Sequence, residues 1–411
     1  MRASFDVKPE QDLLGRLLGA RAAQFELSAV QPEGGRERFR ISNANGRIKV
    51  EGSTPSSLLF GVNWYLKYIA HVEISTNGAR LGPLPTWPLP AAAIEGETPY
   101  AFTEGMDTNP FAFDLFTEMA WRNEPVDTVE WTAAYVRRRY GAADPHALAA
   151  WKVLLNTAYG IRVNEVEFNS ERDAAQESLF NAQPSLTVNR ASHWSPEAMR
   201  YDAEEFKHAL PEMLRVAPQL RMSETYEYDL VDIARQTLAN ESRLLLPRIK
   251  AAVDAKQRSE FRSLSERWLH LMDLQDELLG SSRFFLVGTW LRFVAPWAST
   301  SAEAARLNHD ARSMLTTWGD RKASEGADLH DYGNKDWAGL THDYYRVRWQ
   351  KYFDSLDAEL SSGISSRQID WFGLGDAWNH DSHPYPSRPH GDTYDIAARI
   401  AGALNLDVRQ P

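Results

Sequence analysis

The sequence predicts an α+β protein that is mostly α-helical, with a small α/β domain at residues 1–90, a linker at 91–112 and an all-helical domain at 113–411. Before Gly82, apolar and polar residues alternate as in half-buried strands, whereas after Pro110 apolar residues recur with the helical period. Six of the 21 prolines lie between these two positions and interrupt regular structure there. A chain of 411 residues also exceeds one ordinary hydrophobic core, which favours two or three domains.

The N-terminal segment is expected to fold as helix, strand, hairpin, helix and strand. Leucines on one face predict a helix over 11–20, and alternation predicts a strand over 25–29. Asn45–Gly46 separates two alternating runs and indicates a two-residue hairpin turn, because both positions must accept positive φ. Thr54–Pro55 has the residues of an N-cap and a first helical position, and residues 72–74 alternate as a last strand. Nothing in this segment suggests chemistry.

After Pro110 the pattern predicts helices almost throughout. They are expected over 113–122, 129–140, 147–159, much of 197–318 and 337–360, with breaks at Pro211, Pro218, Pro247 and Pro296. A polar segment, 164–195, is expected to be a long loop. Residues 377–392 form a Pro/His-rich loop before a last helix near Thr393.

Composition excludes several classes of function. The net charge of −11 argues against an extended polyanion, so no nucleic-acid partner is expected. The absence of cysteine excludes disulfides, thiolate metal sites and cysteine nucleophiles. No run reaches the roughly 18 apolar residues of a membrane span, and no signal peptide is visible, which leaves the compartment open. Phosphate-loop, dinucleotide, zinc-protease and serine-hydrolase motifs are missing, so no cofactor is expected.

A His/Asp cluster near the C-terminus could be read as metal ligands: His380, Asp381, His383, His390 and Asp392. No two of them sit four residues apart on a predicted helix, and no cysteine supports them. We therefore interpret the cluster as a Pro-rich surface loop with Asp392 or Thr393 capping the next helix, and we expect no metal site.

The run LHDYGNKDWAGLTHDYYRVRWQKYFDSL, from Leu329, is richer in polar and aromatic residues than a core helix requires. The Asn, Lys, Asp and Trp side chains at its start could converge on a polar ligand. The same run could instead be an aromatic-packed helix with Asn334 as N-cap. The spacing is compatible with both.

Glu104 is a further candidate for chemistry. It follows the short apolar stretch 100–102 and precedes a glycine, which is typical of a residue at a strand end, where glycosidase carboxylates sit. A single Glu-Gly pair is also common in loops, so the dipeptide alone fits a loop residue equally well.

Several motifs together resemble the alpha-N-acetylglucosaminidases, family 89 of the glycoside hydrolases. The segment TEGMDTNPFAFDLFTEMAWRNEPVDTVEWTAAYVRRRYG, residues 103–141, is similar to the stretch that closes that family's catalytic barrel. The run from Asp331 follows the helical-domain pattern DY-x-NK-x-x-AGL…YY-x-x-RW. Further similar segments are PSL at 184–186, YDLVDIARQ from Tyr228, SRFFLVGTWL from Ser282 and YPSRPHGDT from Tyr385. The N-terminal unit resembles the family's small α/β domain, so the resemblance covers most of the chain.

This resemblance implies retaining hydrolysis of terminal α-linked N-acetylglucosamine from glycans, with one glutamate as nucleophile and another as acid/base. Glu104 falls on the family's nucleophile, in a motif PEG-x-x-x-N in which Thr103 replaces the proline. Asn109 keeps the asparagine of that motif, and Trp194 best matches an aromatic residue of the sugar pocket. We expect Asn109 and Trp194 to bind substrate. Members of the family are usually exported or lysosomal.

The chain departs from the family in one large respect. A (β/α)8 barrel needs roughly 250 residues, yet only residues 91–109 separate Pro90 from Pro110. The segment GETPYAF from Gly96, which should lead into the barrel, runs directly into the segment that should leave it. We therefore expect only a barrel-strand remnant within 91–112, and the acid/base glutamate has no counterpart.

Three hypotheses follow from this departure. In the first, the chain is a glycosidase by descent that is inactive or very weak on natural glycosides. In the second, it is a non-catalytic remnant that acts as a scaffold or weak sugar-binding module. In the third, the gene holds barrel codons that this sequence lacks. Sequencing the DNA around the codons for 95–104 tests the third. A lost barrel should also expose apolar surface through which copies of the chain associate.

Overall fold

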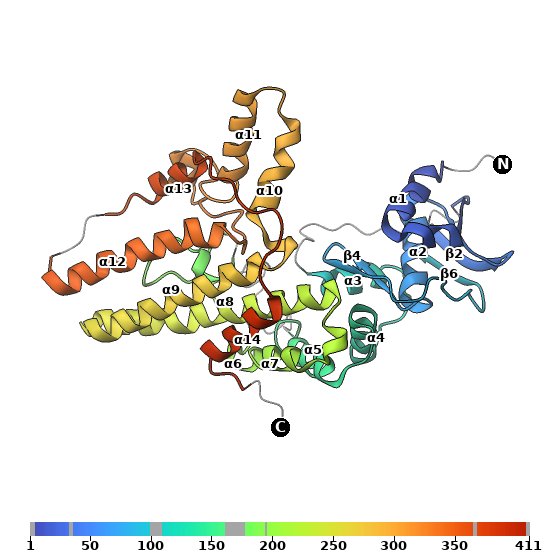
Figure 1. Ribbon diagram of the computed structural model, residues 1–411, viewed down its shortest axis with the longest axis horizontal. Coiled ribbons are helices and arrows are strands. Elements are labelled where there is room, and N and C mark those ends of the chain that lie inside the picture. The colour runs from blue at the N-terminus through green and yellow to red at the C-terminus, as the bar shows by residue number, and fades with distance from the viewer. Residues whose placement is uncertain are drawn as a thin grey trace. The chain divides into compact units, whose positions relative to one another are not determined.

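The computed structural model describes residues 5–32, 36–98, 109–160, 177–193, 195–364 and 368–407 (Figure 1). Its described residues are mostly α-helical with a small sheet, which confirms the predicted mostly helical class; the absence of a barrel stays a prediction. The chain divides into two compact units, Met1–Leu148 with Val216–Tyr228, and Ala149–Arg215 with Asp229–Pro411. The boundaries expected at 90 and 112 stay predictions. Among the helices of the described ranges, none is both long and apolar enough to cross a membrane.

The first unit contains a four-stranded sheet in the order β1-β3-β2-β6. Its strands are β1 Phe25–Ala29, β2 Glu37–Ala44, β3 Arg47–Gly52 and β6 Ile94–Thr98, and a separate hairpin joins β4 Glu73–Ser75 to β5 Gly78–Arg80. β1 pairs with β3 in parallel, and the other neighbours are antiparallel. The Asn45–Gly46 turn is confirmed, since both residues have positive φ and Ala44 pairs with Arg47.

One face of this sheet is covered by α2 Pro55–Tyr68. Thr54 caps α2 as predicted: its side chain accepts from the Ser57 N–H at 3.1 Å, and the Ser57 hydroxyl accepts from the Thr54 N–H at 2.9 Å. The core between sheet and helix consists of the alternating apolar residues that predicted the strands, together with one face of the helix. Its fully buried members include Ile41, Ile48, Val50, Leu58 and Tyr65.

The edge strand β6 lies within 91–112, where the sequence predicted a barrel-strand remnant, and that interpretation stays a prediction. Residues 94–98 pair with β2, with Gly96 opposite Phe39. A Cβ at position 96 would lie 2.4 Å from Cε1 of Phe39, so only glycine allows this approach. The Phe39 ring cannot retreat, because Phe60 and Trp121 pack against it at centroid distances of 5.7 and 5.3 Å.

The first unit contains further helices besides α2. They are α1 Lys8–Leu18, α3 Pro110–Met119 and α4 Thr128–Tyr140, with the short turns η1 Gly19–Gln24 and η3 Pro218–Leu220; α5 Pro145–Asn156 begins in the first unit and ends in the second. The predicted helices over 11–20, 113–122 and 129–140 are thereby confirmed to within a few residues.

The second unit is built from helices. They are α6 Ala203–Phe206, α7 Ala209–Arg215, α8 Glu224–Asp254 (whose first turn belongs to the first unit), α9 Arg258–Gly280, α10 Val287–Val294, α11 Ser301–Ser313, α12 Val347–Ser362, α13 Trp371–Asn379 and α14 Thr393–Ala403. Shorter turns are η2 Leu179–Asn181, η4 Arg283–Phe285, η5 Ala295–Trp297, η6 Lys322–Gly326 and η7 Thr341–Arg346. α8 and α9 lie side by side, joined by the Glu241–Arg267 ion pair at 3.1 Å, and α12 packs along α9 (Figure 1).

An aromatic core holds α9 and α12 together. The Trp268 ring lies 4.4 Å from that of Trp349 and 4.8 Å edge-on from that of Phe180, all fully buried. Phe180 belongs to the segment predicted as a loop, and its described part, 177–193, is indeed mostly irregular but is buried at 178–182. The Trp349 indole N–H donates to the Phe180 carbonyl at 3.0 Å, so this irregular segment is part of the core.

Three helix predictions in this unit were wrong. Pro247 does not break α8, because the nearby residues Leu246 and Ile249 are buried and this packing offsets the lost backbone hydrogen bond. The helix expected from Trp337 begins at Thr341, since Ala338 is extended and forms a bridge with Leu286. α13 was not predicted at all.

Candidate active site

The structure describes one of the three predicted site residues. Glu104 and Trp194 lie outside the described residues, and Asn109 is described and half-buried. Asn109 is the N-cap of α3, and its side-chain oxygen accepts from the Ala112 N–H at 3.0 Å. This fixes where the chain enters α3, five residues after Glu104.

A buried ion cluster of Lys67, Glu73, Asp114, Glu118 and Arg138 holds α3 within the first unit. The Lys67 ammonium lies 2.7 Å from carboxylate oxygens of both Asp114 and Glu118, one helical turn apart on α3. Arg138 of α4 reaches the second oxygen of Asp114 at 2.9 Å and Glu73 of β4 at 3.4 Å. The cluster therefore ties α3 to α2, α4 and the β4–β5 hairpin at once.

The two glutamates of this cluster have pKa values shifted in opposite directions. Burial favours the neutral acid for Glu118, but the charge and hydrogen bond of Lys67 outweigh it and lower the pKa to about 2. Burial raises the pKa of Glu73, and the nearby Asp114 charge adds to that effect against Arg138 and Arg139. Glu118 is thus held ionised, while ionised Glu73 is disfavoured.

In the second unit, Arg243 of α8 organises the segment around Trp194. Its buried guanidinium donates to the carbonyls of Glu177, Asn189 and Glu197 at 3.1, 2.7 and 3.1 Å. Burial lowers the pKa of Arg243 to about 10, although Glu177 opposes this. The backbone on both sides of residue 194 is therefore fixed to one helix by main-chain contacts.

An amide–carboxylate network joins this segment to the DYGNKDW motif. The Asn181 amide donates to Asn334 at 3.1 Å and to Asp336 at 2.9 Å. Asn334 donates in turn to Glu177 at 3.2 Å. Asp336 also accepts from Gln275 of α9 and from the Arg235 guanidinium of α8, at 3.0 and 2.9 Å.

A second buried pair stabilises the start of the same motif. The Asp331 carboxylate and the Arg348 guanidinium are both fully buried and lie 2.8 Å apart. Arg348 also donates to the Asn181 carbonyl at 2.7 Å and to the Tyr344 hydroxyl at 3.0 Å. Asp331 itself has φ +57, so the backbone turns sharply there.

A pocket of ≈220 Å³ lies beside the start of the DYGNKDW motif. It is lined by Gln183, Val188–His193, Asp328 and His330. Asp328 lies 3.1 Å from the ring of His193 and 3.2 Å from that of His330. The pocket is large enough for a small polar ligand and presents charged and hydrogen-bonding groups from two segments.

The motif beginning at Leu329 therefore converges on buried partners. Asn334 is not an N-cap: its side chain bonds Glu177 and the Asp331 carbonyl, while Asp276 accepts from the N–H groups of Gly339 and His342. The sequence analysis singled out none of Glu177, Asn181, Arg235, Gln275 and Arg243 as site residues, because they lie far from the 331–336 motif in sequence, on the 177–181 segment, α8 and α9.

In the His/Asp cluster near the C-terminus, Asp392, His390 and His383 each contact a different part of the second unit. Asp392 caps α14, as predicted, by accepting from the Asp395 N–H at 3.0 Å. The His390 N–H donates to the Gly280 carbonyl at 2.9 Å, and the His383 ring packs edge-on against Tyr385.

Comparison with known proteins gives matches to both halves of the chain. The family model for the alpha-N-acetylglucosaminidase (NAGLU) C-terminal domain matches residues 131–402, and that for the N-terminal domain of the same proteins matches residues 8–91. Human alpha-N-acetylglucosaminidase is 32% identical over 303 residues, which cover 72% of this chain. The chain spans only 38% of that relative's length.

Solved structures resemble the chain in fold. A family 89 glycoside hydrolase from Clostridium perfringens, in complex with its substrate GlcNAc-alpha-1,4-galactose, superposes with a TM-score of 0.88 at 17% identity, covering 96% of this chain and 80% of that one. The enzyme from the same organism in complex with 2-acetamido-1,2-dideoxynojirmycin gives the same values. At this level of identity the likeness concerns the fold.

Proposed function

The chain belongs to the alpha-N-acetylglucosaminidase family, and on that premise we propose that it carries the nucleophile half of a retaining glycosidase site, with Glu104 as nucleophile. The observation that carries this proposal is that the family matches, 8–91 and 131–402, lie on either side of Glu104. The proposed substrate class is terminal α-linked N-acetylglucosamine, in keeping with the ligands named for the Clostridium perfringens structures.

The proposed chemistry is a double displacement at the anomeric carbon. A Glu104 carboxylate oxygen forms a bond to that carbon as the glycosidic C–O bond breaks, and water then hydrolyses the glycosyl-enzyme. Asn109, fixed at the start of α3, and Trp194, in the segment held by Arg243, are proposed to contact the sugar. The buried ion cluster holds α3 within the first unit, and the amide–carboxylate network holds the 177–181 segment within the second.

We further propose that the acid partner is missing. Only residues 92–130 separate the two matched ranges, whereas a barrel takes roughly 250 residues. General acid assistance contributes about 10²–10⁴-fold to rate, and a sugar alkoxide leaves poorly without a proton. The chain should therefore cleave an aryl glycoside, whose leaving group needs no proton, and be inactive or very weak on natural disaccharides.

Parallel assays on both leaving groups test the proposal. The full chain is incubated with 4-nitrophenyl α-N-acetylglucosaminide and with GlcNAc-α-1,4-galactose, alongside Glu104→Gln and the nearby control Glu97→Gln. We expect aryl-glycoside turnover that is lost in Glu104→Gln and kept in Glu97→Gln. Efficient disaccharide hydrolysis that depends on Glu104 would show that the chain holds an acid, and turnover unaffected by Glu104→Gln would refute the nucleophile assignment.

Exposed apolar side chains favour a second candidate, a non-catalytic scaffold that associates with other copies. The side chains of Phe293 on α10 and Trp297 on η5 are 65% and 78% exposed and lie four residues apart. This role predicts self-association in size-exclusion chromatography with light scattering and no turnover of either glycoside. A monodisperse monomer at high concentration contradicts it.

A further inference from the structure

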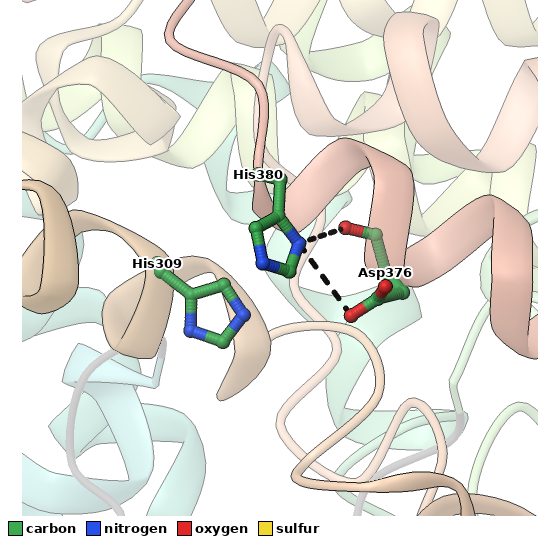
Figure 2. Close-up of side chains that lie close together, drawn as sticks. All are labelled: His309, Asp376 and His380. Atoms are coloured by element: carbon green, nitrogen blue, oxygen red, sulfur yellow. Dashed lines mark hydrogen bonds and ion pairs between the residues drawn. The ribbon is translucent and has the colours of Figure 1, made fainter.

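Three potential metal ligands meet where α11 packs on α13 in the second unit. His309 comes from α11, and Asp376 and His380 come from the C-terminal part of α13 and its cap, as Figure 2 shows. One ligand atom from each side chain lies within 4.8 Å of the others. We propose that these three residues bind a divalent transition-metal ion, with Zn²⁺ as the cation their donor set fits best.

The hydrogen bonds of the two histidines leave one ring nitrogen of each ready to bind. His380 Nδ1 lies 2.9 Å from the Asp376 carbonyl oxygen; a carbonyl only accepts, so Nδ1 carries the proton and Nε2 keeps its lone pair. His309 Nδ1 lies 3.2 Å from the Asp310 carboxylate, which likewise leaves Nε2 unprotonated in the neutral ring. Metal-binding histidines typically donate their other N–H to a carbonyl or carboxylate in this way.

The rings are already placed near one another. The centroids of His309 and His380 lie 4.5 Å apart with a 58° tilt, which is not a stacked arrangement. Asp376 and His380 are four residues apart, so their side chains project from the same helical face, with carboxylate and Nδ1 3.5 Å apart. In Figure 2 the two rings and the carboxylate turn toward a common space between α11 and α13.

The fit to zinc follows from geometry and charge. With Zn–N and Zn–O bonds of about 2.1 Å, tetrahedral ligand atoms lie about 3.4 Å apart. The three side chains, with one potential ligand atom of each within 4.8 Å of the others, must therefore move closer together, and the exposed His380 can rotate to bring its Nε2 toward the ion. Two imidazoles and one carboxylate suit Zn²⁺ better than Mg²⁺ or Ca²⁺, which prefer oxygen ligands. The carboxylates of Asp376 and Asp310 offset the ion's charge.

A bound ion would join two helices that are far apart in sequence. From the sequence we expected no metal, because no candidate ligand lay four residues from His380 on a predicted helix. Asp376 was not considered, since α13 was not predicted. None of the three residues belongs to the amide–carboxylate network or lines the 220 Å³ pocket. The proposed role is a structural clip that fixes α13 on α11.

To test the proposal, Zn²⁺ is titrated by calorimetry into the full chain after chelator treatment and dialysis. The absorption spectrum of bound Co²⁺ serves as a second readout. The variants are His309→Ala, Asp376→Asn and His380→Ala. The matched control is His270→Ala on α9: His270 also follows an acid, Glu266, by four residues, yet no third ligand was found for this pair among the described residues.

We expect one zinc per wild-type chain and a thermal midpoint that rises on zinc addition. Loss of an outer partner of a metal site typically costs 10–100-fold in affinity, so loss of a direct ligand should cost about 100-fold or more in each of the three variants. His270→Ala should bind as the wild type does. The conservative Asp376→Asn, checked for an unchanged circular dichroism spectrum, guards against misfolding. Absence of stoichiometric binding, affinity unchanged in His309→Ala, or an equal loss in His270→Ala would overturn the proposal.

Discussion

Replacing Glu118 by glutamine should destabilise the first unit strongly at neutral pH and weakly in acid. The Glu118 carboxylate is fully buried on α3 and accepts from Lys67 and from Arg122, which follows α3, each at 2.7 Å, and from the Tyr68 hydroxyl. Glutamine keeps the shape but removes the charge, so Lys67 retains only Asp114 as its anionic partner in the cluster.

The magnitude follows from the pKa of this carboxyl. A native pKa of about 2 against the ordinary 4.5 corresponds to about 3 kcal/mol at neutral pH, at 1.36 kcal/mol per unit. Removing one partner of a buried ion pair costs 3–5 kcal/mol by experience, which agrees. Because the folded pKa is depressed, this stabilisation is present above about pH 4.5 and is lost as the pH falls toward 2.

Glu73 supplies a control of opposite sign. Burial raises its pKa in the folded state, so its favourable contribution is present at low pH and diminishes as the pH rises past 4.5. Urea unfolding of wild type, Glu118→Gln and Glu73→Gln between pH 3 and pH 7 measures both effects. The difference between wild type and Glu118→Gln should grow with pH, and that for Glu73→Gln should shrink. A pH-independent loss for Glu118→Gln, or one below about 1 kcal/mol at pH 7, refutes the reasoning.

Three further substitutions test other contacts. Gly96→Val places a side chain against the immobile Phe39 ring and should cost about 1–3 kcal/mol in urea unfolding; an unchanged midpoint would show that β6 does not dock this closely. Arg348→Met removes the guanidinium from the buried Asp331 carboxylate, which keeps only the His330 ring at 3.1 Å as an ion-pair partner among the described residues, and should cost about 3–5 kcal/mol, so a neutral effect contradicts the pairing. Asn109→Ala removes the α3 cap and should cost about 1 kcal/mol by thermal unfolding, with Asn109→Asp close to wild type.

The sequence predicted the elements whose signals are local. Strand alternation, the Asn45–Gly46 turn and the Thr54 cap depend on neighbouring residues, and all were confirmed. α13 was missed because Gly373 and Gly375 lower helix propensity. Position 375 is a glycine because of a tertiary contact: a Cβ there would come within 2.8 Å of Thr317. A contact with the distant Thr317 cannot be predicted from the local sequence pattern.

The candidate site was predictable only where a motif is contiguous. The motif at 331–336 was singled out, yet its partners Asn181 and Arg235 lie more than a hundred residues away. The fold brings them together through the packing of α8, α9 and the buried turn η2. Glu104 was singled out by its local pattern, whereas its role as nucleophile and the choice of Trp194 came from resemblance, and both roles stay predictions.

Arg243 has a consequence for substitutions in the segment that it holds. Its guanidinium donates hydrogen bonds to backbone carbonyl oxygens of the 177–197 segment, and every amino acid has the same backbone carbonyl. Mutations in that segment can therefore change the side chains offered to a ligand while the path of the chain is retained. A single arginine on α8 thus holds the backbone of this segment through contacts that do not depend on the segment's side chains.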